Sequence, residues 1–212
     1  MAQQETPYPV QLAVDYPDRQ LNRLTTFFRL VVAIPIFIVL VAVTGGSFGS
    51  GIEEESARVT MGAGGVLIIA PLLMILFRRK YPRWWFDWNV ALFKFTLRVE
   101  SYLLLLRDEY PSTDEEQAVH LEISYPDAGR ELNRWLPLVK WLLAIPHYVV
   151  LFFLIIVALV LVIFTWFAIL FTGRYPRLFF DYVVGTMRWS ARVEAYAVLL
   201  VTDRYPPFRL GP

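Results

Sequence analysis

The sequence predicts a mainly helical membrane protein made of two tandem repeats. In each repeat we expect a two-helix membrane hairpin, an amphipathic interfacial helix and short strands that contribute to a small cytoplasmic sheet. Three observations support this fold class: long apolar runs, an ordered set of motifs that occurs twice, and an apolar composition. Hydrophobic residues make up 57% of the chain and charged residues 18%, with a mean hydropathy of +0.47. Soluble domains carry about 25% charged residues.

The duplicated motifs divide the chain into residues 1–112 and residues 113–212. Tyr-Pro-Asp occurs at 16–18 and 125–127, Leu-Asn-Arg at 21–23 and 132–134, and Ala-Ile-Pro at 33–35 and 144–146. Further along, Tyr-Pro-Arg occurs at 81–83 and 175–177, and Arg-Val-Glu at 98–100 and 192–194. The same order in both halves predicts an internal duplication.

The apolar runs predict where each repeat meets the membrane. In the first repeat, residues 27–43 and 61–77 form one predicted hairpin. In the second, residues 136–172 are one apolar run, which as a single helix would be ~55 Å long. A bilayer core is only ~30 Å thick. We therefore expect this run to turn near Ile155–Ala158, either as two short spans or as a hairpin that does not cross fully. Re-entrant or tilted pairs remain an alternative in both repeats.

The distribution of charges predicts the orientation. The loop at 44–60 carries three glutamates and one arginine, whereas most basic residues flank the other ends of the apolar runs. Basic flanks stay in the cytoplasm, so an even number of spans places both termini there. Residues 1–20 are polar and lack the features of a signal peptide. The predicted location is the bacterial inner membrane, with a multi-pass topology.

The remaining elements follow the same order in both repeats. Strands are expected at 10–16 and 119–125, interfacial helices at 83–97 and 177–191, and closing strands at 98–106 and 192–202. Each helix carries a narrow charged stripe on an aromatic surface, which suits the membrane–water interface. The alternative is a core helix packed under the sheet with its charges paired.

The candidate site residues are charged residues that occur in both repeats and one histidine in an apolar run. For lipid or partner binding the candidates are Arg23, Arg83, Asp87, Arg98, Glu100, Arg134, Arg177, Asp181, Arg192 and Glu194. Their structural alternative is a set of salt bridges that tie each interfacial helix to its strand. His147 is a candidate intramembrane polar site, because an ionisable group at membrane depth suggests function. Snorkelling to the cytoplasmic edge explains Lys140 and its counterpart Arg29.

Several classes of site are not expected. With no cysteine and two histidines, the chain lacks the usual donors of a metal centre. We predict no metal, cofactor or catalytic residue, and the net charge of +1 predicts no nucleic-acid partner. The expected partners are the lipid bilayer and either another protein or further copies of the chain.

The duplicated motifs together resemble those of DUF4389, an uncharacterised family of bacterial membrane proteins. The resemblance covers nearly the whole chain as two tandem copies and implies a bacterial inner-membrane protein, but it implies no activity. We expect a non-enzymatic accessory or scaffold protein of a larger membrane complex. The alternatives are a protein that binds lipid headgroups and a subunit of an oligomeric channel or transporter.

Overall fold

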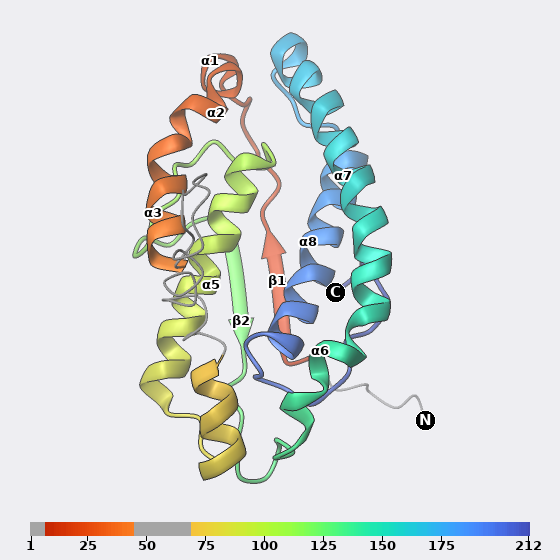
Figure 1. Cartoon of the computed structure of the whole chain (residues 1–212). Coiled ribbons are helices and arrows are strands. Elements are labelled where there is room, and N and C mark those ends of the chain that lie inside the picture. The colour runs from red at the N-terminus through yellow and green to blue at the C-terminus, as the bar shows by residue number, and fades with distance from the viewer. Residues whose placement is uncertain (1–6, 45–68) are drawn as a thin grey trace, which may run out of the picture.

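The computed structural model describes residues 7–44 and 69–212 and is mainly helical, with one two-stranded sheet (Figure 1). The first half contains β1 (Val10–Val14), α1 (Arg23–Phe27), α2 (Arg29–Val32), α3 (Ile34–Thr44), a helical segment at 69–73 that continues as the π-helical turn η2 (Met74–Arg78), and α5 (Arg83–Leu103). The second half contains β2 (Val119–Ile123), the 3₁₀ turn η3 (Leu136–Leu138), α6 (Lys140–Leu143), α7 (Ile145–Thr172) and α8 (Arg177–Ala197).

The two strands come from different halves and pair antiparallel, with Leu12 opposite Leu121. Alternation along the strands buries Val10, Leu12 and Val119, whereas His120 and Glu122 point to the exposed side. Each strand packs on the long helix of the other half, since β1 contacts α8 and β2 contacts α5. The largest core cluster therefore contains residues of both halves, whereas two smaller clusters each lie within one half.

Hydrogen bonds between the halves occur in matched pairs. The Tyr16 hydroxyl donates to the Tyr175 carbonyl, and the Tyr125 hydroxyl donates to the Tyr81 carbonyl. These four residues belong to the Tyr-Pro motifs that occur twice in the sequence. Equivalent motif residues thus make equivalent contacts in opposite directions.

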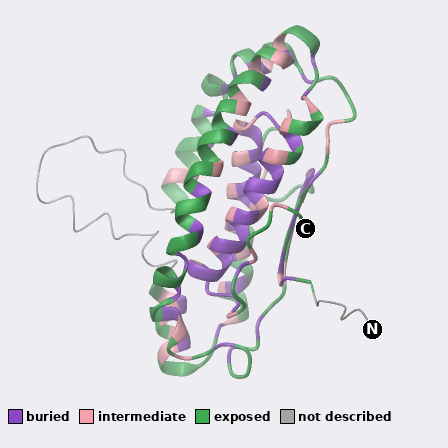
Figure 2. Ribbon diagram, turned by 90° about the vertical axis from the view of Figure 1, so that its right-hand side faces the viewer, coloured by how far each residue is buried: buried purple, intermediate pink, exposed green. Residues whose placement is uncertain are grey.

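The elements form layers. In both views the strands run alongside α8, and α8 lies between the strands and α7 (Figures 1 and 2). On the other side of the molecule, α5 contacts both β2 and α3. The outer layer of helices thus covers one face, and the exposed side of the sheet forms the opposite face.

The structure corrects the predicted second hairpin. Residues 145–172 form one continuous helix, so the turn expected near Ile155–Ala158 is wrong. Pro146 lies in the first turn of α7, where its missing N–H breaks no helical hydrogen bond. In the first half, the loop at 45–60 and residues 61–68 of the second predicted span lie outside the described residues.

The predicted closing strands are also wrong. Residues 98–103 and 192–197 continue α5 and α8 instead of forming strands. The predicted sheet is therefore reduced to β1 and β2 within the described residues. Val99, Tyr102, Val193 and Tyr196 favour strands by intrinsic propensity, but burying them against neighbouring helices outweighs that weak preference.

Candidate functional sites: an apolar outer face and an arginine-lined pocket

The outer layer of helices presents a broad apolar surface, which we call the apolar outer face. It comprises α1 from Leu24 onward, α2, α3, residues 69–77, η3, α6 and α7, and the exposed Arg23 at the start of α1 lies at its edge. Large side chains there project away from the protein, including Phe153 at 61% exposure and Phe171 at 78%. Figure 2 shows the exposed residues on this layer and the buried ones on the helix beneath it. Soluble monomers rarely expose contiguous apolar patches larger than a few hundred Å².

One seam of α7 faces the protein. His147, Leu151, Ala158, Thr165 and Ile169 are its buried residues, at spacings that follow the helical repeat. Most of the remaining circumference is exposed and apolar. Among the described residues, α7 is the one helix long and apolar enough to cross a membrane.

The two charged residues within the apolar outer face point inward. Arg29 is 2% exposed and pairs with Asp108, and Lys140 is 0% exposed and lies 2.7 Å from Asp203. Each cation also lies over a tyrosine ring, Arg29 over Tyr102 and Lys140 over Tyr196. The snorkelling prediction is therefore wrong, because both charges are neutralised inside the protein and the outer face carries neither.

His147 is fully buried against the second half's own aromatic residues. Its Nδ1 accepts a hydrogen bond from the Trp189 indole at 3.0 Å, and its ring stacks on Phe208 with centroids 4.0 Å apart. These contacts fix the ring between α7, α8 and the C-terminal segment. The structure therefore gives His147 a packing role, with Nε2 buried and without a hydrogen-bond partner among the described residues.

The charged stripes of α5 and α8 change character along each helix. At the start of α5, Arg83 and Asp87 are exposed and 3.9 Å apart, and Arg83 lies over the Tyr125 ring. Further along, Arg98 and Arg192 are buried. The C-terminal part of each helix is thus buried, as the core-helix alternative expects. The first turns are exposed at the surface.

Arg98 and Arg192 fasten the segments that follow their helices. Arg98 donates to the carbonyls of Ser112 and Glu115, both at 2.6 Å. Arg192 donates to the carbonyls of Arg209 and Gly211. The predicted salt bridges to Glu100 and Glu194 are wrong, since the ion pairs found among the described residues do not include them.

Glu100 and Glu194 instead are carboxyl groups whose pKa values are raised, chiefly by burial. Burial raises the pKa of Glu100 to about 7, and repulsion from Glu194 adds to the shift. Burial raises the pKa of Glu194 to about 7 as well. Both carboxyl groups are therefore partly protonated near neutral pH.

The other predicted residues are spread over the surface. Arg23 and Asp181 are exposed, and Arg134 donates to the Leu76 carbonyl. The Arg177 guanidinium lies 4.5 Å from the centre of the Tyr16 ring, which matches the contact of Arg83 with Tyr125. The structure thus does not gather the ten predicted charged residues into one site.

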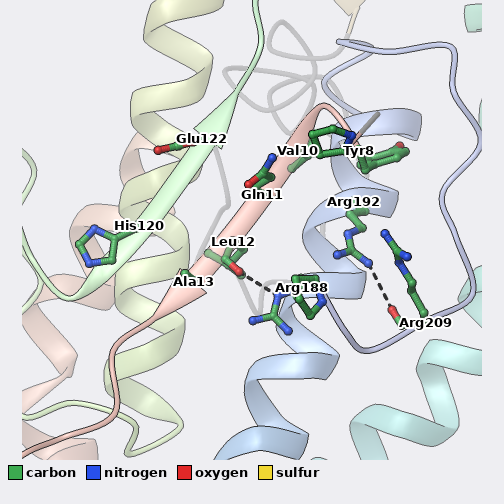
Figure 3. Close-up of a pocket in the computed structure, with 12 residues that line it drawn as sticks. Tyr8, Val10, Gln11, Leu12, Ala13, His120, Glu122, Arg188, Arg192 and Arg209 are labelled. Carbon is green, nitrogen blue, oxygen red and sulfur yellow. Dashed lines mark hydrogen bonds between the residues drawn. The ribbon is translucent and has the colours of Figure 1, made fainter. Parts of the chain in front are cut away.

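A different group of basic residues does converge. Arg188 and Arg192 extend from α8 toward β1, and Arg209 approaches from the C-terminal segment (Figure 3). Together they line a pocket of about 300 Å³ beside the exposed face of the sheet, where Gln11 and Glu122 form part of the opposite wall. Arg188 donates to the Leu12 and Leu210 carbonyls at 2.9 Å, so it connects strand and tail.

Sequence reasoning identified Arg192 but not its neighbours. Arg188 occupies the charged stripe of its helix, and its position one turn before Arg192 was the available signal. No local pattern marks Arg209, because it joins the pocket only through the fold of the tail. Long-range placement of this kind is not encoded in residue spacing.

Comparison with known proteins supports the resemblance in part. Residues 134–209 match the family model described as Domain of unknown function (DUF4389). This segment contains α6, α7, α8 and Arg209 of the pocket. No curated protein and no solved structure matches the chain.

Proposed function

We propose that this protein is a non-enzymatic accessory protein that lies in one leaflet of the bacterial inner membrane through its apolar outer face. The observation that carries the proposal is the inward direction of Arg29 and Lys140, which leaves Arg23 at the edge as the one exposed charge among the described residues of α1 to α3, 69–77, η3, α6 and α7. The apolar outer helices are about one helix diameter thick, roughly 10 Å. Interfacial helices bury their apolar faces to a depth of about 5–10 Å.

The layering favours helices parallel to the membrane over helices that cross it. As one continuous helix, α7 is ~42 Å long, against a hydrocarbon core of ~30 Å. The strands run alongside it, and their outer side exposes Asp15, His120 and Glu122. If α7 crossed the bilayer, these groups would lie at membrane depth, where a charge costs about 3 kcal/mol or more. In the parallel orientation they face water.

We also propose that the halves are tandem repeats related by a pseudo-twofold axis. The reciprocal tyrosine hydrogen bonds and the two inward cations support this relation. Equivalent backbone contacts add to it, since Asp108 accepts from the Asn22 amide and Asp203 from the Asn133 amide. An axis of this kind places the outer helices of both halves in one layer.

Spin labels report the depth of α7 directly. The chain has no cysteine, so single cysteines at Val149, Ile156 and Ile163 can be labelled without background. Collision with oxygen and with a water-soluble nickel chelate gives the depth of each label in vesicles. Similar shallow depths at all three positions support the proposal. A depth that passes through the bilayer midplane at Ile156 contradicts it.

The accessory role is tested on the particle extracted with its native lipid. A stoichiometric foreign protein in that particle supports the role, with the water-facing layer as the surface that meets the partner. A defined homo-oligomer with measurable ion conductance contradicts it and supports the channel alternative, in which the polar faces of several copies line a pore.

A second candidate is recognition of anionic lipid at the rim of the apolar outer face. Trp84 and Trp135 are well exposed beside Arg83 and Arg134, and tryptophan with arginine suits the headgroup region. Arg83→Gln and Arg134→Gln should then weaken flotation with phosphatidylglycerol vesicles and leave phosphatidylcholine vesicles unaffected. Equal losses on both vesicles would contradict headgroup recognition.

A further inference from the structure

The pocket beside the sheet contains more positive charge than its structural contacts require. Arg188 and Arg192 hold the tail through the carbonyls of Arg209, Leu210 and Gly211, and Arg188 also donates to the Leu12 carbonyl of β1. The Arg209 side chain lines the same pocket and makes no hydrogen bond or ion pair within the described part of the chain. Two arginines therefore have a structural role, and the third adds charge without a protein partner.

The charges of the pocket are not balanced locally. Burial lowers the pKa of Arg192, and repulsion from Arg209 and Arg188 lowers it further. Burial also lowers the pKa of Arg188, while the negative charge of Asp181 opposes that shift. On the sheet side, Glu122 is the carboxylate that lines the pocket, and His120 lies beside it paired with Asp15. Among the side chains that line the pocket, three guanidinium groups thus face one carboxylate.

We propose that this pocket binds a phosphate group, either a free phosphate or phosphomonoester or the headgroup of a lipid. Guanidinium groups match the geometry of phosphate oxygens and bind them with charge-assisted hydrogen bonds. The guanidinium N–H groups of Arg209, and those of Arg188 that make no bond to a backbone carbonyl, would donate to the phosphate oxygens. A cavity of about 300 Å³ is at the small end of ligand sites and accommodates a phosphate with a small substituent.

The Gln11 side chain on the exposed face of β1 completes the polar wall. Its amide adds a neutral donor on the side opposite the arginines (Figure 3). Glu122 lies on the same side and opposes an anion, so it limits affinity. The inference does not depend on how the protein lies in the membrane, because the pocket lining belongs to the sheet, α8 and the tail.

The test uses the full chain in micelles of an uncharged detergent at low salt, titrated calorimetrically with inorganic phosphate and with glycerol phosphate. Arg209→Gln should weaken binding about tenfold or more, since it removes a charge-assisted contact without touching the tail's anchors. Glu122→Gln should strengthen binding several-fold. Arg130→Gln is the matched control, because it removes an exposed arginine outside the pocket, and it should bind as the wild type does.

The source of the phosphate is distinguished in nanodiscs. If a lipid headgroup occupies the pocket, discs with phosphatidic acid should compete away glycerol phosphate, and discs of phosphatidylcholine alone should not. If the ligand is soluble, both kinds of disc leave its binding unchanged. Either result supports the site. The proposal would be overturned if the wild-type protein bound neither probe at about 10 mM. It would also be overturned if the wild type and Arg209→Gln bound the probes with equal affinity.

Discussion

Removal of the carboxylate beside Lys140 is the sharpest perturbation of the buried charges. Asp203→Asn leaves a fully buried ammonium group without its counter-charge, and its remaining contacts are the Thr202 carbonyl at 2.7 Å and the Tyr196 ring. Breaking a buried ion pair from one side costs about 3–5 kcal/mol. Because those two contacts remain, we expect the lower end, about 3 kcal/mol, which is more than a hundredfold in the unfolding equilibrium.

The opposite substitution should cost less. Lys140→Met leaves Asp203, which is 19% exposed and still accepts a hydrogen bond from the Asn133 amide, so water and that amide can stabilise the carboxylate. We expect a loss of about 1–2 kcal/mol. The double variant Lys140→Met/Asp203→Asn should resemble Lys140→Met alone, which makes the two effects strongly non-additive.

Unfolding by guanidinium chloride in micelles of an uncharged detergent, monitored by tryptophan fluorescence, gives the free energy of unfolding for each variant. Asp108→Asn in the first half is the matched variant and should show a similar loss, because Arg29 is also fully buried. If Asp203→Asn stays within about 1 kcal/mol of the wild type, the pair acts as an exposed one, and the charge-free outer face loses its physical basis.

Three further predictions concern the interior. The raised pKa values of Glu100 and Glu194 mean that the folded state keeps protons that the unfolded state releases, so stability should fall as the pH rises from about 4.5 to about 7, by up to roughly 3 kcal/mol per group. Replacing both by Gln should flatten the pH profile measured by denaturant titration, and an unchanged profile would assign the slope to other groups. Tyr16→Phe and Tyr125→Phe each remove one inter-half hydrogen bond and should each cost about 1 kcal/mol of unfolding free energy; a loss in only one of them would contradict the proposed pseudo-symmetry. Gly185→Ala places a methyl group 2.9 Å from the Leu210 side chain, so it should loosen the tail and speed amide hydrogen exchange at 208–211, and unchanged exchange would show that the tail adapts.

The sequence predicted the local order of elements better than their connections in space. β1 and β2 lie inside the predicted strands, and α5 and α8 begin directly after the Tyr-Pro motifs, because proline favours the start of a helix. The closing strands were misassigned, since residues such as Val99 and Val193 have strand propensity yet continue a buried helix.

The errors about the membrane have one physical origin. The length of residues 136–172 was compared with the thickness of a bilayer, which assumes that the helix crosses it. Arg29 and Lys140 were placed at the surface for the same reason, although their partners Asp108 and Asp203 lie more than sixty positions away in the chain. Residue spacing alone identifies neither the carboxylate partner of each cation nor the layer of the fold to which a helix belongs.

The most direct test of the account is the sidedness of the two ends of α7. Single cysteines at Gly129, before α6, and at Arg174, just after α7, are treated with a membrane-impermeant maleimide in intact cells and in inverted inner-membrane vesicles. If the outer helices lie parallel to the membrane in one leaflet, both positions react from the same side of the membrane, together with a cysteine at Gln11 on the sheet. Reaction of Gly129 and Arg174 from opposite sides would show that α7 crosses the bilayer and would contradict the parallel orientation.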